Sequence, residues 1–79
     1  MYSPKKEKVE QVDNNFTYHK PNENQADRYH RIRETAKVFA NQMLAECPES
    51  RELSLALTKL EEAVMWANAS IARNEPKNP

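Results

Sequence analysis

Apolar residues between positions 48 and 73 recur in a helical pattern. Successive members of the series are four, three, four, three and four residues apart, which is the spacing of a stripe along one side of an α-helix packed on another. Pro48 suits a first helical turn, Asn74 suits a C-cap, and Pro76 prevents continuation. The pattern predicts one long helix over residues 48–73. Its stripe consists of Leu53, Leu57, Leu60, Val64, Ala67 and Ile71.

A second apolar stripe predicts another long helix over residues 22–46. Its members are three, four, three, four and four residues apart, and Asn22 with Gln25 forms a capping-box pair at the start. Cys47-Pro48 leaves room only for a tight turn, so the two helices should form an antiparallel hairpin in an all-α fold. The stripe consists of Tyr29, Ile32, Ala36, Phe39, Met43 and Cys47.

The N-terminal region is divided from the hairpin by its composition. We expect residues 1–15 to be a polar arm or a short helix over residues 4–12, residues 16–76 to be the hairpin domain, and residues 77–79 to be a tail. In the short helix Ser3 would be the cap. Residues 16–21 should be an extended strap, because the residue before a proline avoids helical geometry. Either its aromatic rings close the end of the hairpin, or one ring faces a ligand.

Further apolar residues predict self-association. Ala56, Ala63 and Ser70 form a second stripe of small side chains, while Leu55 and Trp66 lie off both stripes. A helix that is apolar on more than one side packs on more than one neighbour. The chain offers only one other long helix, and a core of 79 residues is marginal alone. The remaining neighbours should therefore be copies of the same chain.

Composition excludes several function classes. The sequence has no glycine, so it has neither a Walker A loop nor a Rossmann fingerprint. Twelve basic and twelve acidic residues give no net charge, which argues against duplex nucleic acid as a partner. No apolar run is long enough to span a membrane, and no signal peptide begins the chain. We expect no membrane partner.

Catalytic and metal-binding patterns are also missing from the sequence. The single Cys47 fits a reducing cytosol, and its place at the end of a stripe favours a buried, inert thiol over one activated by a helix N-terminus. His19 and His30 lack neighbouring ligands at metal spacing. No nucleophile, base and orienting group occur together. We expect no enzyme activity, no metal and no cofactor.

The remaining chemistry is that of binding. Aromatic rings stack on nucleobases, and cationic side chains neutralise phosphates. Both kinds of group occur among Tyr18, His19, Lys20, Arg33 and Thr35. Pattern alone favours a solvated basic face for the helix residues, but a pocket shared between subunits could combine them with the strap.

Three segments resemble the small phage proteins of the anti-CBASS cyclic-nucleotide sponge family. They are FTYHKP, QADRYHRIRETAK and CPESRELSLALTKLEEAVMWANASIARN, and the resemblance covers residues 16–74. It implies an all-α homohexamer in the host bacterial cytoplasm. Such proteins sequester cyclic di- and trinucleotides made by CBASS immunity, such as 3′,3′-cGAMP and cyclic tri-AMP. They do not cleave them, and the immune effector stays inactive.

The resemblance also implies two kinds of site. Dinucleotides are held where the N-terminal regions of two protomers meet, by a tyrosine matching Tyr18 and by basic and threonine positions matching Arg33 and Thr35. His19 and Lys20 lie beside that tyrosine. Trinucleotides are held at separate sites, for which the candidates are Ser50, Arg51, Ser54 and Arg73. The alternative is a helical oligomer that binds a protein partner, and a phosphodiesterase is the third hypothesis.

Overall fold

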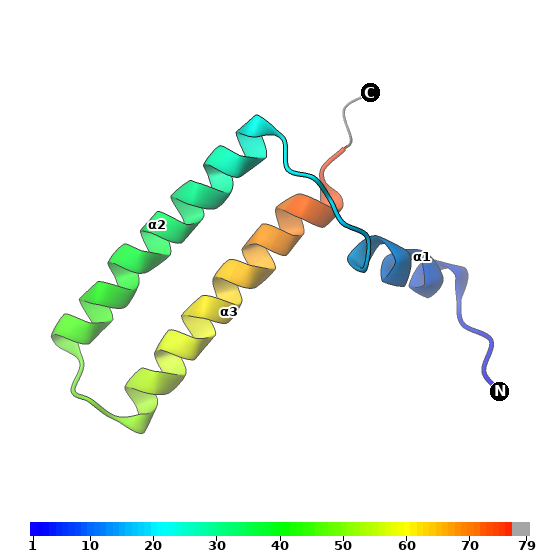
Figure 1. Ribbon diagram of the computed structural model, residues 1–79. Helices are drawn as coiled ribbons and strands as arrows, with labels where there is room; N and C mark the ends of the chain where they lie inside the picture. The colour runs from blue at the N-terminus through cyan, green and yellow to red at the C-terminus, as the bar shows by residue number, and fades with distance from the viewer. Residues whose placement is uncertain (77–79) are drawn as a thin grey trace.

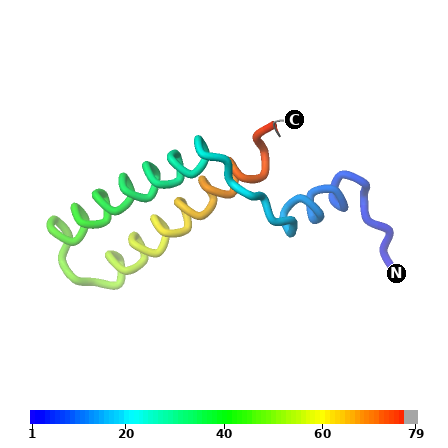
Figure 2. Tube along the Cα trace, turned by 45° about the horizontal axis from the view of Figure 1, so that its top comes forward, coloured from blue at the N-terminus to red at the C-terminus, as the bar shows by residue number. Residues whose placement is uncertain are grey.

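A computed structural model describes residues 1–76, which form three α-helices: α1 (Lys6–Asn15), α2 (Glu23–Glu46) and α3 (Arg51–Asn74). The helices α2 and α3 lie antiparallel and side by side, and a short turn joins them (Figure 1). The helix α1 projects away from the other end of the hairpin, as the turned view in Figure 2 also shows. The predicted all-helical hairpin is confirmed, while the predicted tail at 77–79 lies outside the described residues.

The start of α2 is the predicted capping box. The Asn22 side-chain oxygen accepts from the Gln25 amide at 2.8 Å, and the Gln25 side-chain oxygen accepts from the Asn22 amide at 3.1 Å. These two bonds satisfy amides that the first helical turn leaves without partners. They also fix the direction in which the strap of residues 16–21 enters α2.

The predicted bounds of the last helix were wrong at both ends. The helix begins at Arg51 with Ser50 as its N-cap, because the Ser50 hydroxyl accepts from the Leu53 amide at 3.1 Å. Pro48 lies in the turn and supplies no such acceptor side chain. At the other end Asn74 is still helical and Glu75 is the C-cap.

The N-terminal helix exists but is shifted from residues 4–12. It begins at Lys6, and its cap residue, Lys5, makes no side-chain capping bond, so Ser3 does not have the predicted role. The helix continues to Asn15, where the Phe16 amide still donates to the Val12 carbonyl at 3.0 Å. Contacts of Asn14 with α3, described below, support this last turn.

The stripes face each other, but they cover little surface. Leu53 is 6 % exposed and is the only buried residue among residues 1–76. The other members of the α3 stripe are half-buried, as are most of the α2 stripe, although Phe39 is 51 % exposed. Cys47 is exposed, so the expected buried thiol was wrong. It lies beyond the last turn of α2 in an extended conformation, which takes it off the stripe.

The single chain is far from compact. Its accessible surface is 7002 Å², whereas a compact monomer of 9.2 kDa exposes about 4,900 Å². Its radius of gyration is 17.0 Å, against about 12 Å for a globular chain of this length. No helix in residues 1–76 combines the length and apolar character needed to cross a membrane. Large apolar side chains remain exposed along the hairpin: Val38, Phe39, Leu44, Leu55, Met65 and Trp66.

Candidate functional site

The strap, residues 16–21, runs from α1 past the end of α3 to the start of α2 (Figure 1). Phe16 is 86 % exposed and Tyr18 is 82 % exposed, so in the single chain neither ring closes the end of the hairpin. His19 is half-buried, with Nε2 2.8 Å from the Asn14 carbonyl oxygen. Because a carbonyl only accepts, Nε2 carries the proton in this contact. Because the Tyr18 side chain is exposed, its ring is available for stacking.

A cleft of about 440 Å³ lies between the strap, α2 and the last turns of α3. We call it the strap cleft. It brings together Tyr18, His19 and Arg33 from the predicted dinucleotide set with Arg73 from the predicted trinucleotide set. Among residues 1–76, no carboxylate lines it. The full lining is Asn15, Thr17, Tyr18, His19, Tyr29, Arg33, Asn68, Ala69, Ala72 and Arg73.

Six lining residues of the strap cleft were not among the predicted site residues, and Tyr29 and Asn68 are two of them. Tyr29 belongs to the apolar stripe of α2 and was assigned to packing, although its ring also reaches the cleft. Asn68 carries no signal in the sequence. Its Oδ1 is buried, and no hydrogen-bond partner for it occurs within the described residues. Only the position of Asn68 beside the strap, known once the hairpin is built, marks it.

Arg33 is oriented by a neighbour on its own helix. Its Nη2 lies 3.3 Å from His30 Nδ1, one turn earlier on α2. A guanidinium only donates, so the contact requires a neutral His30 ring that accepts at Nδ1. This contact is exposed and long, so it biases the guanidinium without immobilising it. The remaining guanidinium donors can still reach an anion.

Thr35 lies in a different place from Arg33. Two residues along a helix are about 200° apart around its axis, so their side chains point to opposite sides. Thr35 lines an apolar groove of about 570 Å³ between α2 and α3, together with Ile32, Phe39 and Leu60. A single chain therefore does not unite Tyr18, Arg33 and Thr35 in one cleft.

Lys20 lines a neighbouring cleft of about 390 Å³, which shares Tyr18, His19 and Arg73 with the strap cleft. This second cleft also contains Gln25 and the carboxylate of Glu75. Its charge is therefore mixed, whereas the charged groups of the strap cleft are all basic. The strap residues lie between the two clefts.

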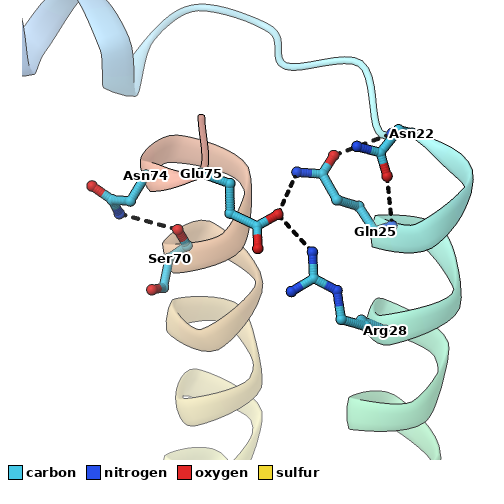
Figure 3. A network of polar contacts seen from close by, with 6 residues as sticks. All are labelled: Asn22, Gln25, Arg28, Ser70, Asn74 and Glu75. Carbon is cyan, nitrogen blue, oxygen red and sulfur yellow. Dashed lines mark hydrogen bonds and ion pairs between the residues drawn. The ribbon is translucent and has the colours of Figure 1, made fainter. Parts of the chain in front are cut away.

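Glu75 ties the end of α3 to the first turns of α2 (Figure 3). One of its carboxylate oxygens accepts from Arg28 at 2.6 Å and from Gln25 Nε2 at 2.8 Å. We call these three residues the clasp. The hydrogen bond from Arg28, and then that from Gln25, lowers the pKa of Glu75 from 4.5 to about 2. The hydrogen bond between Arg28 and Glu75 also raises the pKa of Arg28.

The residues proposed for trinucleotides occupy the two ends of α3. Arg51 and Arg73 are separated by about 33 Å at 1.5 Å of rise per residue. Ser50, Arg51 and Ser54 lie at the hairpin turn, where the Ser50 hydroxyl donates to the Pro48 carbonyl at 3.1 Å besides capping α3. Arg73 thus joins the strap cleft and not the other three. Within residues 1–76, no group of three or more His, Cys, Asp or Glu side chains is arranged to hold a metal ion.

The chain matches a known family model. Residues 8–72 match the Acb2/Tad1 hairpin domain, which is the anti-CBASS sponge family. Comparisons with curated proteins and with solved structures found no match. The matched range spans most of the chain, including α2, the strap and most of α1 and α3. The chain belongs to this family, and membership implies a protein that binds without catalysis.

Proposed function

We propose that this member of the anti-CBASS sponge family is a phage anti-defence protein that binds and withholds cyclic oligonucleotide immune signals in the host bacterial cytoplasm. It does not cleave them. The observation that carries the proposal is the strap cleft, where two tyrosines and two arginines gather without a carboxylate. This combination suits a ligand made of aromatic bases and phosphodiesters.

Each group in the strap cleft has a part in this proposal. Tyr18 stacks on a base, for which its exposed ring is available. Arg33 binds a phosphate through the guanidinium donors that His30 does not use. Arg73 adds positive potential, His19 lines the same cleft beside Tyr18, and Lys20 contacts the ligand from the neighbouring cleft. Because no carboxylate of residues 1–76 lines the strap cleft, the cleft favours binding of an anionic ligand.

The ligand site is completed by a second protomer. Thr35 points away from Arg33 on the same helix, so both can contact one ligand only if two chains contribute. The accessible surface of a single chain, 7002 Å², and its exposed apolar side chains support such an assembly. We propose the homohexamer implied by the family resemblance, with dinucleotides where the N-terminal regions of two protomers meet.

Cyclic trinucleotides take separate sites in this proposal. A site that uses Arg73 together with Ser50, Arg51 or Ser54 must combine different protomers, because the two ends of α3 are far apart. Residues 16–76 then form the assembling and binding domain, and residues 1–15 form an arm that contributes α1. The hexamer provides several sites per particle, which suits stoichiometric capture of a scarce signal.

Calorimetric titration with 3′,3′-cGAMP and with cyclic tri-AMP tests the function. Nanomolar binding, about −12 kcal/mol, is expected, with intact ligand recovered after denaturation and identified by mass. Tyr18→Ala removes a stacking contact and Arg33→Ala a charged hydrogen bond, each worth about 1–3 kcal/mol. Together they should weaken dinucleotide binding by about 2–6 kcal/mol, at least roughly thirtyfold, without dissociating the oligomer. Lys59→Ala, an exposed change in the middle of α3, is the matched control.

Two outcomes favour the other hypotheses. No heat with either ligand would overturn the sponge and leave the oligomer that binds a protein partner, which the exposed apolar surface also favours. Recovery of linear or shortened nucleotide would instead indicate a phosphodiesterase.

A further inference from the structure

We infer that the clasp of Gln25, Arg28 and Glu75 positions the strap for ligand binding, which makes its members positioning residues outside the strap cleft. The inference rests on the proposed function, because it assigns to these residues an effect on the affinity of the strap cleft. None of the three lines that cleft. Gln25 and Glu75 line the neighbouring cleft instead, so the clasp affects the strap cleft chiefly through the chain segment that it holds.

The first attachment of the strap lies at its start. The Asn14 side-chain amide donates to the Arg73 carbonyl at 2.9 Å, which joins the end of α1 to the last turn of α3. His19 Nε2 donates back to the Asn14 carbonyl at 2.8 Å. The first half of the strap is thus folded onto a residue that is itself fixed to α3.

The second attachment lies where the strap enters α2. The Asn22 amide donates to Gln25, whose side-chain amide in turn donates to Glu75 (Figure 3). Arg28 binds the same carboxylate oxygen at 2.6 Å and completes the clasp. The end of the strap is thus fixed to residue 75, only two positions beyond the attachment of its start at residue 73.

The two attachments together place Tyr18. Both ends of the strap are held by one short stretch at the end of α3, so the position of the exposed ring depends on both. Ordering a residue costs about 1–2 kcal/mol in backbone entropy, and binding to a preordered strap avoids part of that cost. Without the clasp, the capping box still joins the strap to α2, but the link between the end of the strap and Glu75 is lost. We expect a roughly tenfold loss of affinity.

A charge swap tests the positioning role. Arg28→Glu and Glu75→Arg each break the clasp, whereas the double variant restores an ion pair with reversed polarity and unchanged net charge. Affinity for 3′,3′-cGAMP should fall in each single variant and recover in part in the double variant, because an arginine at position 75 restores the ion pair but cannot accept the Gln25 hydrogen bond. Lys59→Glu and Glu62→Lys are the matched controls, since this exposed pair on α3 lies away from the strap. Neither control should change the affinity.

A second measurement does not need a ligand. Backbone order parameters of residues 17–20 in the free protein should be near 0.85 in the wild type, fall below about 0.6 in the single variants, and lie between these values in the swap. Unchanged order parameters in the single variants would overturn the inference even if the wild type binds no nucleotide. So would full affinity in the single variants, or a folded double variant that binds no tighter than they do. Failure of the wild type to bind contradicts only the proposed function.

Discussion

The two ends of the helical hairpin are built from different interactions. At the turn, Leu53 is buried and Ser50 caps α3, and the local hydrogen bonds stay within five residues of sequence. At the open end, side chains bridge segments 47 to 59 positions apart: Asn14 to Arg73, Gln25 to Glu75 and Arg28 to Glu75. The turn therefore sets whether the hairpin forms, and the open end sets where the strap lies.

The largest expected effect is at the turn. Leu53→Ala should lower the free energy of unfolding by about 2–5 kcal/mol, because it removes the most buried side chain of the hairpin. Chemical denaturation followed by circular dichroism measures the loss. Leu55→Ala, at a position 45 % exposed, is the matched control and should cost less. An equal cost at both positions would contradict the difference in burial, and would show that Leu55 is covered in the assembled protein.

The next prediction tests whether Ser50 only caps α3 or also contacts a ligand. Ser50→Ala should cost about 1 kcal/mol, or roughly 4–8 °C in Tm, since the Leu53 amide loses its acceptor. Ser50→Asp keeps an acceptor at the cap and should retain most of the stability. If Ser50→Asp is stable but binds cyclic tri-AMP weakly, the serine contributes to the ligand site as well. Equal stability of the Ala and Asp variants would contradict the capping role.

The sequence predicted the features that depend on neighbouring residues. Stripe spacing identified both long helices, and the Asn22–Gln25 pair identified the start of α2, because these signals act within one or two turns. The start of α3 was placed too early because Pro48 and Ser50 are both start signals two residues apart, and only the backbone shows which one caps. Cys47 was misplaced because the stripe was extended past the last helical turn.

The clasp could not be predicted in the same way. Gln25 and Glu75 are 50 positions apart, and no spacing rule pairs them until the register of α2 against α3 is known. The same holds for Arg73, whose inclusion in the strap cleft depends on where α3 ends relative to α1. Tyr29 and Asn68 lie in helices that pack on each other, so the sequence does not show that they also line the strap cleft. Long-range polar contacts thus define the part of the candidate site that local patterns leave open.

Acid should weaken the clasp at the open end of the hairpin. The folded state holds Glu75 at a pKa of about 2, below its ordinary 4.5, so folding favours the ionised form. The stabilisation is complete above pH 4.5 and is lost as the pH falls from 4.5 towards 2. Glu75→Gln lacks this group, so the stability difference between wild type and variant should shrink over that window. Subtracting the two curves cancels the titration of every other carboxylate, and a constant difference would contradict the clasp as the cause.

The smallest expected effect is at the ion pair midway along α3. Lys59 and Glu62 approach to 3.6 Å on an exposed face, without the second donor that Gln25 supplies to Glu75. A double-mutant cycle with Lys59→Met and Glu62→Gln should give a coupling of about 0–0.5 kcal/mol that vanishes at high salt. The same cycle on Gln25 and Arg28 should give larger coupling, since both donors share one carboxylate oxygen. Equal coupling energies in the two cycles would contradict the clasp as an interaction stronger than an ordinary exposed ion pair.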